Sequence, residues 1–173
     1  FLTRQKVRIF RYPEWQETIT INTWLEPRIE KYAVREFEMF DASGNLIGCA
    51  TNSASFYDLK EKKVIPASQR MHKIPVPPRG RALDDPFDSI PRPSVAEFSA
   101  EFSTRLADLD MYRHVNNVVY VEWAVETLPH EVWTGWTLRD HEINFRSETS
   151  LGDIVLSEAE EVTCSDKRIF LHR

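Results

Sequence analysis

The chain is poor in cysteine and has no long apolar run. Its 173 residues include only two cysteines, Cys49 and Cys164, and neither stands in a CxxC or other metal-ligand spacing. This excludes a disulfide framework and a cysteine-based metal site, and it predicts two reduced, buried thiols. No apolar stretch approaches the roughly 18 residues that cross a bilayer, and the charged start FLTRQKVRIF is unlike a signal peptide. We therefore expect a soluble, cytoplasmic protein that binds no membrane, metal or cofactor.

Basic residues are outnumbered and unevenly placed. The chain has 22 Lys and Arg against 27 Asp and Glu, a net charge of −5. Residues 1–93 hold 15 of the basic and 12 of the acidic residues, a balance of +3, which leaves 7 and 15, or −8, for residues 94–173. This pattern argues against nucleic acid as a partner and indicates that the first half could attract an acidic partner or a phosphate. The run Lys60-Glu61-Lys62-Lys63 is typical of a solvated turn.

Glycine is scarce, with five residues, and seven of the ten prolines lie between Pro66 and Pro93. A stretch so rich in proline cannot donate a continuous backbone ladder, so 66–93 is predicted to be a linker. Alternating apolar and polar residues on both sides of it are typical of β-strands. We expect an N-terminal repeat over 1–65 and a C-terminal repeat over 94–173, each built of antiparallel strands with few helices.

The two predicted repeats are related by a constant shift in sequence. Arg4 and Arg139 are 135 positions apart, as are Phe10 and Phe145, and the matched residues keep the strand phase. A helix in the second repeat would then have its counterpart before residue 1. We expect the first repeat to lack its helix and the chain to be truncated at its C-terminus as well.

The most informative segment is 107–129, where acidic, imidazole and amide side chains lead into an almost wholly apolar helical stretch. First-turn amides of a helix have no intrahelical partner, so they can stabilise a carbonyl oxygen that gains negative charge. Asp110 and His114 would stand beside that oxygen, with the amides near Val115 and Asn116 as donors. Asn117 would hold a water molecule or a carboxylate in place.

Each of these residues also has a purely structural interpretation. Asp110 could be a helix cap or turn former, His114 a packed histidine, and Asn116 and Asn117 helix caps. A helix this apolar must be enclosed, because only a narrow stripe of glutamates faces away from its apolar residues. One enclosed helix per repeat within a curved antiparallel sheet is the hotdog arrangement. The predicted fold class is therefore α+β, a tandem hotdog.

Three stretches carry a resemblance to a known family. DLDMYRHVNNVVYVEW (108–123) and EINFRSETSLGD (142–153) resemble the C-terminal hotdog of the acyl-acyl-carrier-protein (acyl-ACP) thioesterases of bacteria and plant plastids, and RIFRYPEWQETITINTWLEP (8–27) resembles their N-terminal hotdog. The likeness spans essentially the full chain. It implies hydrolysis of fatty acyl-ACP to free fatty acid and ACP, with catalytic residues in the C-terminal repeat only.

The resemblance places the family's catalytic Asp, His and Glu on Asp110, His114 and Glu148, the last in the strand after the helix. Two positions depart from the plant enzymes. Tyr112 stands where they have an Asn, which leaves the role of that position uncertain, and Thr149 replaces a Cys once proposed as a nucleophile, which removes a thiol mechanism at that position. Glu148 could instead be an ordinary exposed residue or an ion-pair partner of a neighbouring arginine.

The residues leave three functions open. The first is an acyl-ACP thioesterase in which Glu148 or Asp110, together with His114, activates water. The second is a hotdog thioesterase acting on coenzyme A esters, and the third is a catalytically inactive acyl-binding subunit. Basic residues such as Arg79 and Arg81 near the entrance would favour the carrier protein as partner. The expected assembly is a monomer with an internal pseudo-dimer, or a homodimer.

Overall fold

The chain forms two compact units in its computed structural model. Unit 1 comprises Phe1–Asp88 and Leu138–Arg146, and unit 2 comprises Ser89–Thr137 and Ser147–Arg173. The residues that the structure describes are 1–26, 31–84, 89–163 and 166–173. Among them, no helix has both the length and the apolar character needed to cross a membrane.

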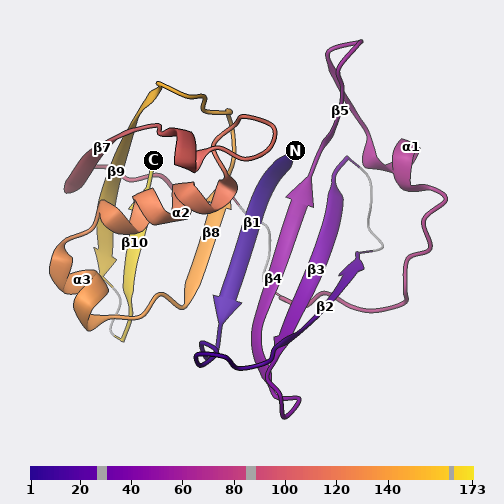
Figure 1. The fold of residues 1–173 in the computed structure, drawn as a ribbon, viewed down its shortest axis with the longest axis horizontal. Helices are drawn as coiled ribbons and strands as arrows, with labels where there is room; N and C mark the ends of the chain where they lie inside the picture. The colour runs from indigo at the N-terminus through magenta and orange to yellow at the C-terminus, as the bar shows by residue number, and fades with distance from the viewer. Residues whose placement is uncertain (27–30, 85–88, 164–165) are drawn as a thin grey trace. The chain divides into compact units, whose positions relative to one another are not determined.

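Unit 1 is built on a five-stranded antiparallel sheet in the order β2-β3-β4-β1-β8 (Figure 1). Its strands are β1 (Leu2–Ile9), β2 (Thr20–Leu25), β3 (Ala33–Phe40), β4 (Leu46–Ala54) and β8 (Asp140–Asn144). β3 and β4 are joined by a turn in which Gly44 has a φ of 83°, a conformation that glycine adopts without steric cost. Gly44 thus lets the chain reverse direction between the two strands.

The last strand of this sheet comes from the far end of the sequence. β8 pairs with β1 from Arg4, opposite Asn144, to Arg8, opposite Asp140. Ion pairs across the two strands join Arg4 and Lys6 to Glu142, and Arg8 to Asp140 at 2.5 Å. The sequence assigns residues 94–173 to one repeat, whereas the structure places β8 in unit 1. The boundaries of the repeats stay a prediction.

The proline-rich segment is not a free linker throughout. It follows a hairpin made of β5 (Phe56–Asp58) and β6 (Lys63–Ile65), whose turn contains Lys60, Glu61 and Lys62, and it begins with the short helix α1 (Ala67–Met71). Ala67 and Met71 are buried against Leu25 at the end of β2. Two buried apolar side chains are enough to hold this helix on the sheet, although proline content alone predicts extended chain here.

Residues that follow α1, among them Arg81 and Ala82, lie against the sheet and make polar contacts with it. Glu36 on β3 is completely buried, and its Oε2 accepts the Thr51 hydroxyl at 2.6 Å and the Ala82 amide at 3.1 Å. Arg81 Nε lies 3.7 Å from the other carboxylate oxygen. One buried carboxylate thus joins two strands to the covering segment.

A second contact holds the same segment nearby. Trp24 Nε1 donates to the carbonyl of Gly80 at 3.0 Å, and the Arg79 guanidinium lies over the Trp24 ring, 4.0 Å from its centre. Arg79 also pairs with Glu38. Both arginines that the sequence offers for binding a partner are therefore engaged within unit 1.

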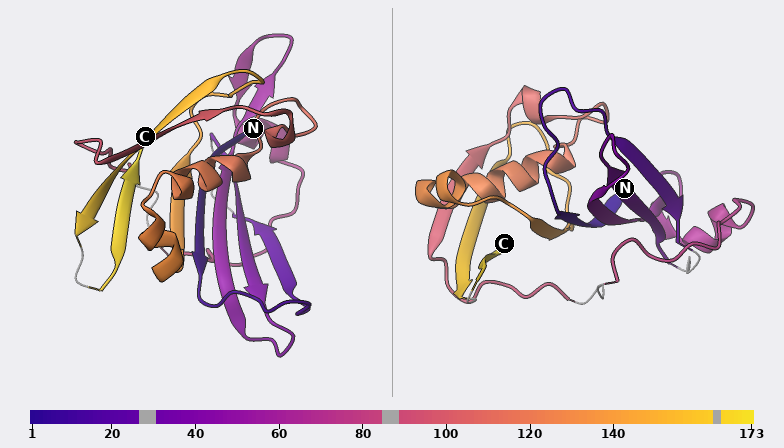
Figure 2. Two further views of the ribbon diagram at one scale, coloured as in Figure 1. Left: turned by 60° about the vertical axis from the view of Figure 1, so that its left-hand side comes forward. Right: turned by 90° about the horizontal axis from the view of Figure 1, so that it is seen from below.

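Unit 2 has a three-stranded antiparallel sheet in the order β10-β9-β7, with a helix lying on one face (Figures 1 and 2). Its elements are β7 (Phe98–Ser103), the 3-10 turn η1 (Leu106–Asp108), α2 (Asn117–Glu126), α3 (His130–Gly135), β9 (Ile154–Thr163) and β10 (Arg168–His172). The sequence predicts one helix that closes at Pro129. The structure ends α2 before that proline and starts α3 directly after it, because proline fits the start of a helix but not its interior.

One face of α2 forms the core of unit 2. Val119 and Trp123 are buried with Val115, and Phe102 of β7 stacks on Trp123 at a ring-centre distance of 5.6 Å. The Thr127 hydroxyl closes the helix by donating to the Trp123 carbonyl at 2.7 Å. This buried face confirms the curved sheet packed around a helix that the sequence predicts.

The shift of 135 residues recurs in the order of the strands. Applied to β1, β2 and β3, it gives 137–144, 155–160 and 168–175. These ranges fall on β8, β9 and β10 respectively. The shift found between single residues is therefore also a shift between successive strands.

Because His172 is partly buried, we expect the folded chain to lose stability in mild acid. Burial lowers its pKa, and its Nδ1 is buried without a hydrogen-bond partner among the described residues. Below the ordinary histidine pKa of about 6.5, the unfolded chain binds a proton that the folded chain does not, so the free energy of unfolding falls as the pH falls. Urea denaturation at about pH 7.5 and about pH 5.5 should show this fall.

The variant H172Q should show a smaller fall between the two pH values. His141, whose pKa burial also lowers, should account for part of the remainder. The matched control H72Q alters an exposed histidine and should behave as the parent does. An identical fall in H172Q and the parent would contradict the assignment.

Candidate active site

The segment before α2 is a short loop closed on itself. Leu109 and Val115 form a β-bridge, and within the loop the Asp110 amide donates to the His114 carbonyl at 2.8 Å. Arg113 turns the chain with a φ of 66°, and its amide donates to the carbonyl of Asp110 at 3.0 Å. These bonds fix where the His114 side chain leaves the backbone.

Asp110 organises this loop through its carboxylate. Oδ1 accepts the amide of Tyr112 at 2.8 Å and the amide of His114 at 3.3 Å. No hydrogen bond from the Asp110 carboxylate to the imidazole is present among the described residues. Asp110 thus makes the hydrogen bonds of a turn former, which is the structural alternative that the sequence leaves open, and its catalytic role stays a prediction.

His114 and Glu148 come together although 34 positions separate them in the sequence. His114 Nε2 lies 3.3 Å from Glu148 Oε2, and their side chains are 42% and 53% exposed. Glu148 stands in the loop after β8, which ends at Asn144, so the prediction that it lies in a strand is wrong. An exposed imidazole beside an exposed carboxylate is open to both water and substrate, and it can take up and release a proton.

The neighbouring loop is held in place by the backbone. The Val115 amide donates to the carbonyl of Thr149 at 3.0 Å, which fixes the segment that carries Glu148 beside the segment that carries His114. Thr149 thus contributes its backbone to the site. Tyr112 also contributes its amide, to Asp110, while its side chain is exposed.

Two of the amides predicted to hold the oxyanion are occupied. The Val115 amide bonds to Thr149 and the Asn116 amide to the carbonyl of Asp108 at 2.8 Å. The Asn116 side chain caps α2 by accepting the Val118 amide at 3.1 Å. The prediction that the Val115 and Asn116 amides hold the oxyanion is therefore corrected. At the start of α2, the amide with no acceptor among the described residues is that of Asn117, and the Asn117 side chain is exposed.

Asp108 is a residue of the site that the sequence reasoning missed. It is buried, its carboxylate accepts the Arg105 amide at 2.7 Å and the Arg105 guanidinium at 2.7 Å, and the latter holds its pKa below the usual range. Its carbonyl holds the Asn116 amide. The Arg-x-x-Asp spacing at 105–108 is the signal that could have identified this support of the helix start.

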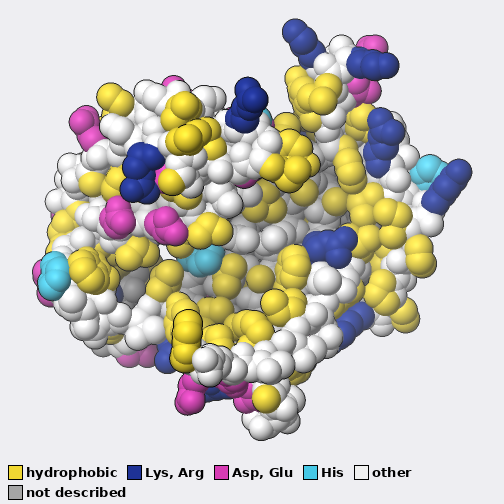
Figure 3. Space-filling model, in the orientation of Figure 1, with side chains coloured by type: hydrophobic (Ala, Val, Ile, Leu, Met, Phe, Trp, Pro, Cys, Tyr) yellow, Lys and Arg dark blue, Asp and Glu magenta, His cyan; other side chains and the backbone are white. Residues whose placement is uncertain are grey.

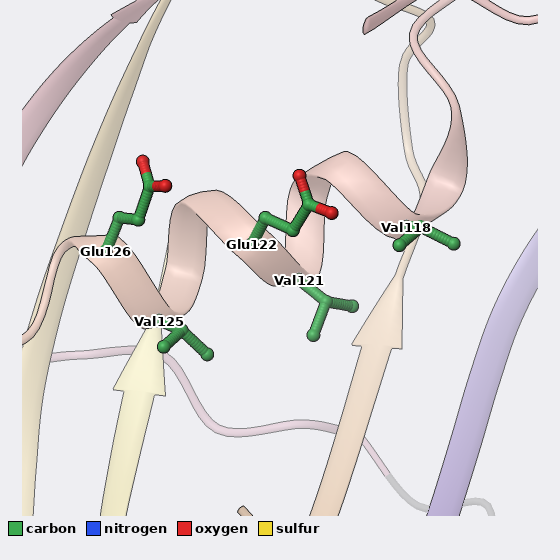
Figure 4. Close-up of a pocket in the computed structure, with 5 residues that line it drawn as sticks. All are labelled: Val118, Val121, Glu122, Val125 and Glu126. Carbon is green, nitrogen blue, oxygen red and sulfur yellow. The ribbon is translucent and has the colours of Figure 1, made fainter. Parts of the chain in front are cut away.

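A second face of α2 is apolar and open. Val118, Val121 and Val125 line a shallow pocket along the helix, with Glu122 and Glu126 at its edge (Figure 4). Val118 is 61% exposed, so the prediction of a fully enclosed helix holds for one face only within unit 2. This apolar strip starts four residues after His114.

The described part of the chain also bears on the predictions made for metal binding and for the two cysteines. No group of three or more His, Cys, Asp or Glu side chains with the spacing of a metal site occurs among the described residues. Cys49 is free and buried as predicted, and burial raises its pKa. Cys164 lies outside the described residues.

Comparison with known proteins covers most of the chain. The family model for the acyl-ACP thioesterase N-terminal domain matches residues 1–73, and that for the acyl-ACP thioesterase C-terminal domain matches residues 92–173. Oleoyl-acyl carrier protein thioesterase 2, chloroplastic, of Arabidopsis thaliana is 28% identical over 163 residues, which are 88% of this chain and 44% of the relative. The chain spans about half the length of the curated relatives it matches.

Solved structures show the same fold. The 12:0-ACP thioesterase from Umbellularia californica superposes with a TM-score of 0.83 at 21% identity, over 99% of this chain and 66% of that one. An acyl-ACP thioesterase from Bacteroides thetaiotaomicron gives a TM-score of 0.76 at 23% identity, over 94% of this chain and 65% of that one. These neighbours confirm the hotdog fold. With both of its halves matched by the two domains of one family, the chain belongs to the acyl-ACP thioesterases.

Proposed function

We propose that this chain contains the catalytic residues of an acyl-ACP thioesterase, which hydrolyses a fatty acyl thioester to free acid and carrier thiol. The observation that carries the proposal is the 3.3 Å contact between His114 Nε2 and Glu148 Oε2. Thioester hydrolysis needs a base that makes water nucleophilic and an acid that protonates the leaving thiolate. One imidazole held by a carboxylate can perform both steps in turn.

The proposed roles follow from the contacts. With the Nε2 proton donated to Glu148, the other ring nitrogen of His114 is left as the base that takes a proton from water. Glu148 orients the ring and stabilises the positive charge that develops on it. Asp110 fixes the loop that carries His114, and the Asn117 amide is the candidate donor to the oxyanion.

The apolar strip of α2 supports an acyl substrate. A fatty acyl chain needs apolar surface that starts close to the reacting carbon, and Val118 begins such a strip in the first turn of the helix. The contact between His114 and Glu148 also speaks against an inactive acyl-binding subunit, since such a protein needs no histidine and carboxylate side by side. Hydrolysis of coenzyme A esters remains the alternative.

A matched pair of substrates tests the proposal. The same acyl group is presented as the carrier-protein thioester and as the coenzyme A thioester, and thiol release is followed for both. We expect kcat/KM for the carrier-protein thioester to be at least about tenfold higher, because a protein substrate adds contacts outside the acyl group. A preference for the coenzyme A ester would support the alternative, and no hydrolysis of either would refute the proposed function.

A further inference from the structure

Unit 1 has a surface of exposed cations at the β5–β6 hairpin and α1, which we call the hairpin surface. Its members are Lys60, Lys62, Lys63, Arg70 and Lys73, all exposed. Figure 3 shows dark-blue side chains gathered over these elements at the upper right. Only Lys63 has an ion-pair partner among the described residues, Glu61 at 3.8 Å, and both of these side chains are about two-thirds exposed.

Several other cations of unit 1 pair with nearby carboxylates, as Arg11 does with Glu17 at 2.6 Å and Arg79 does with Glu38. Residues 56–76 hold five Lys and Arg against two Asp and Glu, a balance of +3 in a chain of net charge −5. Concentrated charge of one sign steers a partner of the opposite sign, whereas paired charges cancel.

The hairpin and α1 share one electrostatic environment. Asp58 lies at the base of the hairpin turn, and its Oδ1 accepts the amides of Lys60 at 2.9 Å and Glu61 at 3.0 Å. These bonds lower the pKa of Asp58, and the charges of Arg70 and Lys63 lower it further. The charge of Arg70 on α1 therefore reaches a carboxylate of the hairpin, as that of Lys63 does.

The turn keeps a lysine where the backbone favours another residue. Lys62 has a φ of 50°, in the left-handed region that glycine and asparagine adopt at lower cost. Leu59, beside it in the turn, is 84% exposed, and Val64 on β6 is also exposed. Apolar side chains among cations are typical of a surface that binds another protein, where both kinds of contact are used.

We propose that the hairpin surface docks an acidic face of the carrier protein. This inference rests on the proposed function, since it is that function which brings a carrier protein to the chain. Carboxylates on the carrier would pair with the lysines while an apolar side chain covers Leu59. The negative balance of the rest of the chain would repel the same partner elsewhere, so that docking is confined to this surface.

The test compares two triple variants of the full chain that lose the same charge. The hairpin variant carries K60S, K62N and K63S, with asparagine chosen for position 62 because it tolerates the backbone there. The control variant carries R35S, R92S and K167S, which remove three exposed cations elsewhere. Binding of purified holo carrier protein is measured by calorimetry at low and at high salt.

We expect the hairpin variant to bind roughly tenfold more weakly than the parent at low salt and to lose most of the salt dependence, while the control stays within about twofold. Equal binding by the hairpin variant and the parent would overturn the proposal, as would an equal loss in both variants. So would a parent that binds phosphatidylglycerol vesicles but not carrier protein. Hydrolysis of a small acyl-pantetheine thioester by the parent tests the catalytic function separately, since that substrate has no protein to dock.

Discussion

Replacing Glu148 by glutamine should lower thioester hydrolysis by about a thousandfold and leave the unfolding transition unchanged. The carboxylate lies 3.3 Å from His114 Nε2 and fixes the orientation of the ring. General acid–base catalysis contributes about a hundredfold to ten-thousandfold, and an imidazole without its carboxylate loses most of that. Because the side chain is 53% exposed, its replacement removes little packing. Steady-state hydrolysis and urea denaturation of the same preparation measure both effects.

The matched control is E101Q. Glu101 is an exposed carboxylate on β7, away from the α2 pocket, so this variant makes the same chemical change in the same unit and should keep full activity. H114Q should match E148Q, and the double variant should be no worse than either, because both residues act through one proton transfer. Activity of E148Q within about threefold of the parent would remove Glu148 from the mechanism.

Replacing Glu36 by alanine should have the largest effect on stability, a loss of about 3 to 5 kcal/mol in the free energy of unfolding. The side chain is fully buried, and its carboxylate accepts hydrogen bonds from the Thr51 hydroxyl and the Ala82 amide, with Arg81 Nε 3.7 Å away. Its removal leaves two buried donors without their acceptor and takes away the carboxylate nearest to Arg81. Urea denaturation of the full chain gives the free energy directly.

A neighbour on the same strand provides the control. Glu38 pairs with Arg79 at the surface, where an ion pair contributes about 0 to 1 kcal/mol, so E38A should be far milder than E36A. The double variant E36A/R81M should recover part of the loss, since it removes the neighbouring cation together with the carboxylate. Equal losses in E36A and E38A would show that the buried carboxylate is not the anchor described here.

The sequence predicts best what is decided locally. The start of α2 follows from Asn116, whose side chain caps the first turn, and its end follows from Pro129, which no helix interior accepts. The loop at Asp110 was open to two interpretations because a carboxylate can bind a backbone amide or a reacting group equally well. Only the positions of the amides of Tyr112 and His114 separate the two.

Long-range partners were not predictable in the same way. Nothing near Val115 shows that its amide is taken by Thr149, because that bond joins segments 34 positions apart. The contact of His114 with Glu148 could be placed from the family resemblance but not from spacing. The burial of Ala67 and Met71 likewise depends on Leu25, which precedes them by more than forty positions. Such contacts are fixed by packing of the whole chain, which local periodicity does not contain.

The pairing of β8 with β1 has a consequence for how the chain is synthesised. The first stretch of unit 1 ends at Asp88, and β8 begins at Asp140, 52 residues later. At about 5 to 20 residues per second, the ribosome adds β8 roughly 3 to 10 seconds after that stretch, and until then β1 lacks this partner strand. An uncovered strand of this kind invites aggregation with other nascent chains, and lysine and arginine on it are a protection against that. The strand β1 carries Arg4, Lys6 and Arg8, whose charges would oppose such aggregation during synthesis. Once β8 has been made, the same side chains form ion pairs with its carboxylates.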